Sequence, residues 1–179
     1  MEKKELMYEG KAKKVYSTED DAFCIVSYKD DATAFNGEKK GTIVGKGVVN
    51  NRMSNFMFKL LEEKGIPTDF VEELNDRDAV LKRVEIVPLE VIVRNKAAGS
   101  FSKRFGVPEG TAFNTPTLEY CLKDDALGDP MINDSQIIAI GAATREELDT
   151  IAKYTMKINE VMVAFFKECK VDLIDFKIE

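Results

Sequence analysis

Histidine is absent from the 179 residues of this chain. Ser-His and Cys-His catalytic pairs and imidazole metal ligands are therefore excluded. The three cysteines, Cys24, Cys121 and Cys169, are odd in number and lack CxxC spacing. A disulfide framework or zinc site is not expected, and buried reduced thiols are the simpler interpretation. Chemistry must come from carboxylates, lysine, arginine, backbone N–H groups or a metal with oxygen ligands, such as Mg²⁺ beside phosphates.

Long apolar runs are also missing. No stretch of 18 or more apolar residues occurs, so no transmembrane helix and no membrane partner are expected. The segment Met1–Glu5 is charged and lacks the apolar core of a signal peptide, which predicts a cytoplasmic protein. The net charge of −6 argues against a nucleic-acid partner. An anionic ligand would need a local cluster of cations and backbone donors.

Hydrophobic patterning divides the chain into strands at first and mixed strands and helices later. We expect strands at residues 6–9, 13–17, 22–29, 79–84, 89–94 and 171–179, and helices at 47–64, at 100–105 and from a Thr144–Glu147 capping box to about 169. The proline-containing residues 106–143 are expected to be loops with short elements. The first two strands are expected to form a hairpin, and the strand at 22–29 is expected to follow as a third antiparallel strand. Without regular βαβ alternation, the pattern favours an α+β fold.

The two longer helices carry apolar faces. The first is expected to present one stripe to the core, formed by Val48, Val49, Met53, Phe56, Met57, Leu60 and Leu61. The second has a broad apolar face of Leu148, Ile151, Ala152, Ile158, Met162, Phe165 and Phe166. In the final strand, Ile174, Phe176 and Ile178 are expected on one face and Asp175, Lys177 and Glu179 on the other.

Four segments could carry chemistry, and the first is YEGKAKKVY at residues 8–16. Its glycine-containing turn, with Lys11 and Lys13, could place ammonium and backbone N–H groups over a triphosphate. The sequence is neither a Walker A loop nor GxGxxG. A solvated basic hairpin is the alternative.

The second segment runs from Leu89 to Phe105. Glu90 and Arg94 share one strand face, and small residues lead from there to Ser100. Ser100 is well placed to cap a short helix, and an arginine beside a helix N-terminus is a credible monophosphate site. A tight turn with a surface arginine is the alternative.

The remaining two segments are acidic and contain a lysine each. The loop Lys123–Pro130 could bind a metal, orient an amino group or be an ordinary polar loop. Lys177 and Glu179 project together from the last strand. They could serve a phosphate and Mg²⁺, or form an exposed ion pair.

In this order, the segments resemble those of SAICAR synthetases. The matching stretches are GKAKKVY at 10–16, KGVVNNRMSNFMFKLLEEKGIPT at 46–68, VPLEVIVRNKAAGS at 87–100, KDDALGDPMIND at 123–134 and VDLIDFKIE at 171–179. They extend over the whole chain, and the third and fourth are the most specific. The resemblance implies an α+β enzyme with a kinase-like ATP-binding lobe at 1–86, formed by an antiparallel sheet. A mixed α+β second lobe at 87–179 would pack with it, and ATP would lie between the lobes.

The resemblance also implies a reaction: L-aspartate is joined to carboxyaminoimidazole ribonucleotide with ATP and Mg²⁺, giving SAICAR, ADP and phosphate. It implies the following roles: Lys11, Lys13, Lys82, Lys177 and Glu179 for the nucleotide; Glu179 and Glu90 for metal; Glu90, Arg94 and Ser100 for the ribonucleotide; Lys123 and Asp129 for catalysis with aspartate. A homodimer is expected from the same resemblance.

Two departures from the family pattern stand out. Some members carry Gly-Asp-Gly near position 36, where this chain has Asn36-Gly37. Members also continue past the FKIE-like strand into a hairpin with a second Mg²⁺ carboxylate and a later phosphate-binding arginine. These are not among the 179 residues. A nucleotide-binding module without catalysis therefore stays open beside the ligase.

Overall fold

The computed structural model describes residues 1–34 and 39–179. They form two compact units, Met1–Glu85 and Ile86–Glu179. The division between the units falls one residue before the expected lobe boundary. The functional roles expected of the two lobes stay predictions. Asn36-Gly37 lies outside the described residues.

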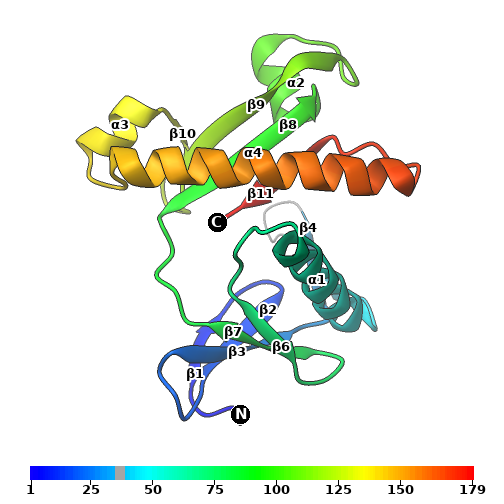
Figure 1. The fold of residues 1–179 in the computed structure, drawn as a ribbon, viewed down its shortest axis with the longest axis vertical. Coiled ribbons are helices and arrows are strands. Elements are labelled where there is room, and N and C mark those ends of the chain that lie inside the picture. The colour runs from blue at the N-terminus through cyan, green and yellow to red at the C-terminus, as the bar shows by residue number, and fades with distance from the viewer. Residues whose placement is uncertain (35–38) are drawn as a thin grey trace. The chain divides into compact units, whose positions relative to one another are not determined.

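The first unit is built on a five-stranded antiparallel sheet in the order β1-β2-β3-β7-β6 (Figure 1). The strands are β1 (Leu6–Glu9), β2 (Lys13–Ser17), β3 (Phe23–Tyr28), β6 (Phe70–Glu73) and β7 (Asp78–Lys82). Strands β4 (Asp31–Ala34) and β5 (Lys39–Thr42) form a separate hairpin. The predicted opening hairpin and its third antiparallel strand are confirmed.

Helix α1 (Lys46–Glu63) packs against β3, β6 and β7, but not through the predicted stripe. Val49, Met53 and Phe56 have half or more of their surface accessible, whereas Asn51 and Asn55 are buried. The asparagines occupy the buried face because they are hydrogen-bonded there. Their amide nitrogens donate to the Asn75 carbonyl oxygen (2.9 Å) and to Glu73 Oε2 (3.1 Å), respectively.

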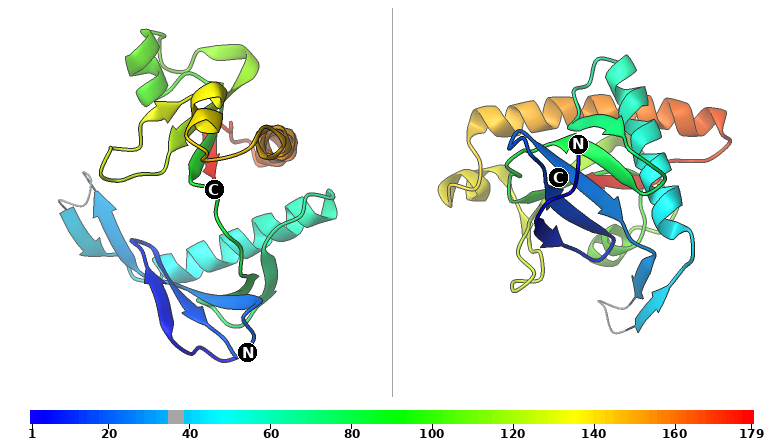
Figure 2. Two further views of the ribbon diagram at one scale, coloured as in Figure 1. Left: turned by 90° about the vertical axis from the view of Figure 1, so that its left-hand side faces the viewer. Right: turned by 90° about the horizontal axis from the view of Figure 1, so that it is seen from below.

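The second unit is a four-stranded antiparallel sheet in the order β10-β9-β8-β11. Its strands are β8 (Leu89–Lys96), β9 (Ala112–Leu122), β10 (Met131–Ile132) and β11 (Asp175–Ile178), and its helices are α2 (Ser100–Phe105), α3 (Asp134–Ala139) and α4 (Arg145–Glu168). Seen end-on, α4 lies to one side of these strands (Figure 2). The capping box predicted at its start is present.

The core of the second unit lies on one face of its sheet. Alternate residues of the strands meet side chains of α3 and α4 in a cluster of Leu89, Val91, Tyr120, Ile137, Ala143 and Leu148. The alternation predicted for the last strand is confirmed, because Phe176 and Ile178 are half-buried and Asp175, Lys177 and Glu179 are exposed. The opposite sheet face is thereby left for polar residues.

The expectation of loops between 106 and 143 is wrong, because β9 is an 11-residue strand. A proline favours a break in a strand, but Pro116 lies where the β8–β9 register shifts, between the pairs Arg94–Thr117 and Lys96–Ala112. A proline is tolerated at such an irregularity since no regular ladder hydrogen bond is lost there. The antiparallel sheets and mixed helices confirm the α+β class.

Candidate functional site

The polar face of the second unit's sheet brings together most of the predicted site residues. Strand register places Asp175 opposite Arg94, Lys177 opposite Ile92, Glu119 opposite Ile92, and Cys121 opposite Glu90. Directly opposed residues of paired strands point to the same face. The face therefore carries Glu90, Arg94, Thr117, Glu119, Cys121, Asp175 and Lys177, all turned away from the apolar core.

Arg94 is the centre of this face and is buried, with 7% of its surface accessible. Its Nε donates to Glu119 Oε1 (3.0 Å), one terminal nitrogen donates to Asp175 Oδ2 (2.8 Å), and the other donates to Ser100 Oγ (3.0 Å). Arg94 and Ser100, predicted to share a phosphate site, are thus in direct contact.

Ser100 does not cap α2, contrary to expectation. The N-cap residue is Gly99, with φ of 53°, and no side chain caps the helix. A left-handed backbone conformation favours glycine, which explains why the preceding residue takes the cap position. The Ser100 hydroxyl is directed to Arg94 instead.

Glu119 and Arg104 belong to the same cluster and were missed in the sequence. Glu119 is buried, and its second oxygen accepts from a terminal nitrogen of Arg104 (2.8 Å). The signal was present, because residues 117–122 alternate Thr-Leu-Glu-Tyr-Cys-Leu. Because residues 106–143 were expected to be loops, this alternation was not interpreted as a strand, and Glu119 was not assigned to a sheet face.

Two lysine–carboxylate pairs continue the charged face. Lys177 Nζ donates to Glu90 Oε1 (2.8 Å), and Lys123 Nζ donates to Glu179 Oε2. Lys123, from the predicted aspartate loop, is therefore beside the predicted metal ligand. An ion pair between Lys177 and Glu179, one of the two alternatives for the last strand, is not formed, because each side chain pairs with a residue of another segment.

Asp129 closes the loop between β9 and β10. Its Oδ1 accepts the backbone N–H of Asp124 (3.0 Å), and its own N–H donates to the Asp124 carbonyl oxygen (3.1 Å). Its φ of 49° is positive, which is uncommon for a non-glycine residue. Such backbone conformations occur at functional sites, where surrounding contacts maintain them. The second carboxylate oxygen, Oδ2, has no hydrogen bond within the part of the chain that is described.

Cys121 is buried on the polar face beside these charges. Burial raises the pKa of its thiol; the carboxylates of Glu90 and Glu119 also raise it, and Arg104 and Lys177 lower it. A thiol with a raised pKa is a poor nucleophile at neutral pH. The expectation of buried reduced thiols is confirmed for Cys24 and Cys121 and is wrong for Cys169, which is exposed.

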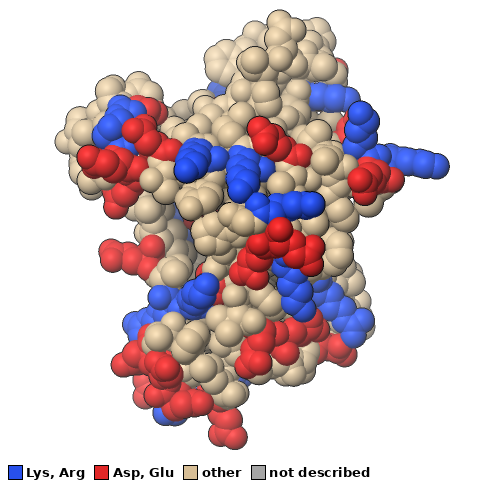
Figure 3. All heavy atoms as spheres, viewed as in Figure 1, with Lys and Arg blue, Asp and Glu red and all other residues tan. Residues whose placement is uncertain are grey.

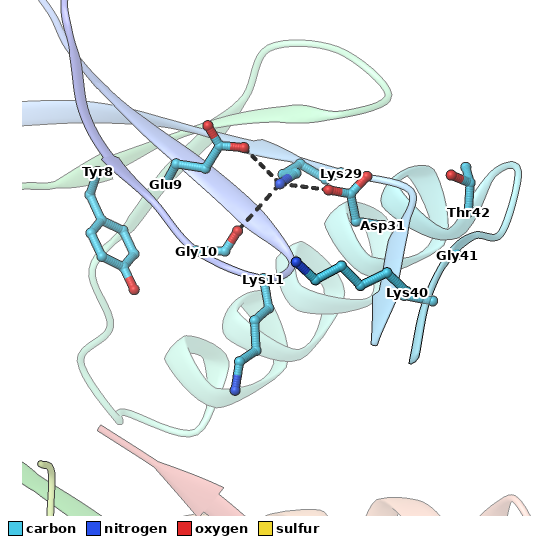
Figure 4. A pocket seen from close by; sticks show the side chains of 10 residues that line it. Tyr8, Glu9, Gly10, Lys11, Lys29, Asp31, Lys40, Gly41 and Thr42 are labelled. Carbon is cyan, nitrogen blue, oxygen red and sulfur yellow. Dashed lines mark hydrogen bonds and ion pairs between the residues drawn. The ribbon is translucent and has the colours of Figure 1, made fainter. Parts of the chain in front are cut away.

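In the first unit, the predicted phosphate turn borders an open hollow of about 630 Å³. Lys11 lines it from the turn, and Lys40 extends toward that turn from β5 (Figure 4). Lys29 is held between Glu9 Oε1 (2.7 Å) and Asp31 Oδ2 (2.6 Å). The Lys29 ammonium group is paired with these two carboxylates. Lys11 and Lys40 are therefore the lysines of the hollow that remain available to bind an anion.

Lys13 and Lys82 lie near Asp69, a residue that no motif in the sequence singles out. Burial raises the pKa of the Asp69 carboxyl, while Lys13 and Lys82 lower it, and the net shift is upward. Lys82 Nζ also donates to the Thr68 carbonyl oxygen (3.1 Å). Two of the predicted nucleotide-binding lysines, Lys13 and Lys82, thus lie close enough to the half-buried Asp69 carboxyl to affect its pKa.

The charged side chains do not form one uniform patch on the face shown in Figure 3, where basic and acidic groups are intermixed. Among the described residues, no group of three or more Asp, Glu, Cys or His side chains is arranged to hold a metal. No helix of residues 1–34 and 39–179 has the length and apolar character needed to span a membrane.

A sequence model described as SAICAR synthetase matches residues 6–179. The chain belongs to the SAICAR synthetase family. It is 61% identical over its 179 residues to the phosphoribosylaminoimidazole-succinocarboxamide synthase of Lachnoclostridium phytofermentans, covering all of this chain and 76% of that protein. The corresponding enzyme of Clostridium acetobutylicum is 59% identical over the same shares. The chain therefore belongs to a family of purine-biosynthesis ligases.

Solved structures of the family share the fold. The enzyme from Ehrlichia chaffeensis superposes with a TM-score of 0.93 at 42% identity, covering 97% of this chain and 73% of that one. A SAICAR synthetase in complex with ADP gives a TM-score of 0.91 at 40% identity, covering 95% and 72%. The expected family fold is thereby confirmed, and the chain spans about three quarters of the relatives' length.

Proposed function

We propose that this chain carries the substrate sites of an ATP-dependent ligase that joins L-aspartate to carboxyaminoimidazole ribonucleotide, giving SAICAR, ADP and phosphate. The supporting observation is the hydrogen bond between Arg94 and Ser100 (3.0 Å) on a charged sheet face. Arginine is suited to bind a phosphate through paired N–H donors. The family role in purine biosynthesis supplies the substrate class, and it also supports a cytoplasmic location.

The reaction proposed has two steps. An oxygen of the imidazole carboxylate attacks the γ-phosphorus of ATP, and the bond to the ADP oxygen breaks. The aspartate nitrogen then attacks the acyl carbon, the C–O bond to phosphate breaks, and the nitrogen loses a proton. An acyl phosphate is already activated, so positioning and charge stabilisation can supply most of the catalysis. This agrees with a chain that contains no histidine.

The second unit is proposed to bind the ribonucleotide and aspartate. Arg94 and Ser100 would hold the monophosphate, with Glu90 toward the imidazole end. The Lys123 ammonium group would attract a carboxylate of aspartate, and the Asp129 carboxylate would hold the aspartate amino group. Lys123 forms a hydrogen-bonded ion pair with Glu179, which holds the lysine near the polar face of the second unit's sheet.

The nucleotide is proposed to use cationic groups named above. Lys11 is proposed to contact the phosphates because it lines a hollow beside a glycine turn. Lys13 and Lys82 are proposed to contribute positive charge beside Asp69. Lys177 remains a proposed nucleotide ligand, although its ammonium group is bonded to Glu90 in this structure.

Magnesium fits the residues that are present. Glu90 and Glu179 each use one oxygen in a pair with a lysine and keep another carboxylate oxygen. Mg²⁺ is commonly bound by one or two carboxylates together with phosphate oxygens and water. When bound, the ion would neutralise phosphate charge, and Glu90 and Glu179 would be the residues that hold it.

Two further assignments rest on the resemblance and are kept as proposals. One is a homodimer. The other is the alternative function, a nucleotide-binding module without catalysis.

Product formation tests the proposal directly. ATP, Mg²⁺, L-aspartate and carboxyaminoimidazole ribonucleotide would be supplied to the 179-residue chain and to the chain extended by the remaining part of the Lachnoclostridium relative. SAICAR and ADP formed in equal amounts by the extended chain are expected. Binding of ATP without product in either form would favour the non-catalytic module. We expect turnover of the short form to be about 10²-fold lower, since small misplacements of reacting groups can cost that much.

Arg94→Ala tests the phosphate assignment. It should weaken ribonucleotide binding by about 1.5–3 kcal/mol, the contribution of a hydrogen bond to a charged group, and leave ATP binding little changed. Calorimetry with both ligands measures the difference. An equal loss for both would contradict a ribonucleotide-specific role.

A further inference from the structure

Glu119 has contacts that differ from those of every other carboxylate in residues 86–179. It and Arg94 are the two charged residues of this unit that are buried. One oxygen of Glu119 accepts from Arg94 Nε (3.0 Å), and the other accepts from Arg104 (2.8 Å). A single carboxylate therefore orients two guanidinium groups side by side.

This cluster is not required to fill the core. The apolar core of the unit lies on the other face of the sheet, where Leu118 and Tyr120, the neighbours of Glu119 in the strand, pack. Buried ion pairs are costly to desolvate and often add little net stability. A buried carboxylate between two arginines, on the face that carries Ser100, therefore calls for a role other than packing.

Both arginines keep donors for a ligand. A guanidinium carries five N–H donors. Arg94 uses three of them, to Glu119, Asp175 and Ser100. Arg104 has a partly exposed side chain and uses one donor to Glu119 and another toward the Met131 sulfur. The remaining N–H groups of the two arginines have no acceptor among the described residues.

We propose that Glu119 is a positioning residue of the monophosphate site and that Arg104 is a further cation of that site, beside Arg94. The ligand is the phosphate monoester of the ribonucleotide, so this inference rests on the proposed function. Two guanidinium groups match its two negative charges. Glu119 fixes their spacing before the ligand arrives, which lowers the ordering cost of binding.

Charge and positioning predict opposite results for Glu119→Gln. Removing a negative charge beside two arginines should by itself strengthen the binding of an anion. An amide, however, has one acceptor oxygen and an NH₂ group, so it cannot accept from both arginines. If positioning dominates, phosphate binding becomes weaker although the site becomes more positive.

The experiment is calorimetry on the 179-residue chain. The ligands are a stable carboxamide analogue of the ribonucleotide, the same compound without its 5′-phosphate, and ADP. The variants are Glu119→Gln, Glu119→Asp and Arg104→Ala. The matched control is Glu160→Gln, which removes the same charge from an exposed position of α4.

Glu119→Gln and Arg104→Ala are expected to weaken binding of the phosphorylated analogue about tenfold or more, on the scale of a lost charged hydrogen bond. The affinities for the unphosphorylated compound and for ADP should change less than about twofold, because neither depends on the lost hydrogen bond to the phosphate. Glu119→Asp keeps two acceptors and should recover part of the loss. Glu160→Gln should have no effect.

Four results would overturn the inference. Unchanged or tighter binding of the phosphorylated analogue by Glu119→Gln would show that charge, not position, governs the site. An equal loss for both compounds would show a merely structural role. If Glu119→Gln does not fold, Arg104→Ala serves as the test. The inference is then overturned if Arg104→Ala keeps the same ratio of affinities for the phosphorylated and unphosphorylated compounds as the unaltered chain. If the unaltered chain binds both compounds equally or neither, the proposed phosphate site itself fails, and with it this inference.

Discussion

The two sheets hold their charged site residues in different ways. In the first unit, Lys11 and Lys13 are exposed on or beside a turn and have no hydrogen-bonded carboxylate partner among the described residues. In the second unit, Arg94 and Glu119 are buried and joined to their neighbours by directed hydrogen bonds. The comparison indicates that the buried charged residues of the second unit are fixed in position by their neighbours, whereas the Lys11 and Lys13 side chains of the first unit are less constrained.

One ion pair of the first unit, Arg77 with Asp30, is also held by directed hydrogen bonds, and Asp30 adjoins Lys29 and Asp31 of the hollow. Arg77 donates both terminal nitrogens to Asp30 (2.8 Å each), and Asp30 also accepts from the backbone N–H groups of Gly45 (3.2 Å) and Gly47 (2.8 Å). The Arg77 guanidinium holds the pKa of the Asp30 carboxyl well below its usual range, with help from the Gly47 N–H. This network secures the start of α1 to the sheet.

Removing Arg94 should give the largest effect on stability. Arg94→Ala leaves Glu119 buried with one partner fewer, and breaking a buried pair in this way costs about 3–5 kcal/mol. Arg83→Ala is the comparison in the first unit, because Arg83 makes only a 3.8 Å pair with exposed Asp21. It should cost less than about 1 kcal/mol. Urea unfolding of both variants measures this, and equal losses would remove the distinction between the two units.

Gly47→Ala should destabilise the first unit by about 1–3 kcal/mol, the usual cost of overpacking. A Cβ atom at this position would lie 2.5 Å from the Tyr28 carbonyl oxygen and 2.5 Å from the Arg77 guanidinium. Gly41→Ala is the control, because a Cβ atom there has nothing within 4 Å. Thermal unfolding of the two variants should separate them clearly, and similar midpoints would contradict the tight start of α1.

Lys13→Ala should lower ADP affinity about twofold to fivefold, because exposed charge pairs each contribute up to about 1 kcal/mol. Ribonucleotide affinity should not change. Lys64→Ala, an exposed lysine of the same unit, is the control for general charge. Calorimetry with ADP measures the difference. A loss as large as that expected for Arg94 with the ribonucleotide would mean that the first site is as constrained as the second.

Asp69→Asn should have the smallest effect, a gain in stability that depends on pH. Burial raises the pKa of Asp69 above its ordinary value of 3.8. The ionised form is therefore penalised in the folded protein, and this cost appears as pH rises from the unfolded-state pKa through the folded-state pKa. The variant should match the unaltered protein at acid pH and exceed it at neutral pH. Unfolding midpoints from about pH 3 to about pH 7 cover this change, and a gain that persists at the acid end would exclude ionisation as its cause.

Much of the fold was predictable because periodicity and end signals are local. The bounds of β1, β2 and α2 match the expectations, and the Thr144 capping box begins α4 where predicted. The α1 stripe was wrong because buried asparagines with hydrogen-bond partners replaced apolar residues on the inner face. Strand β9 was missed because a proline such as Pro116 is tolerated inside a strand only at a register shift. A register shift cannot be predicted without knowing which strand pairs with β9.

The sequence by itself determined the α+β class, the family and the residue types available for chemistry. Motif order and the absence of histidine are properties of the chain alone. Only the tertiary structure decided that Lys123 pairs with Glu179, that Lys177 pairs with Glu90, and that Glu119 joins Arg94 to Arg104. Such pairs join segments far apart in sequence, and strand register selects them. Local patterns record which face a residue occupies but not which residue lies opposite it.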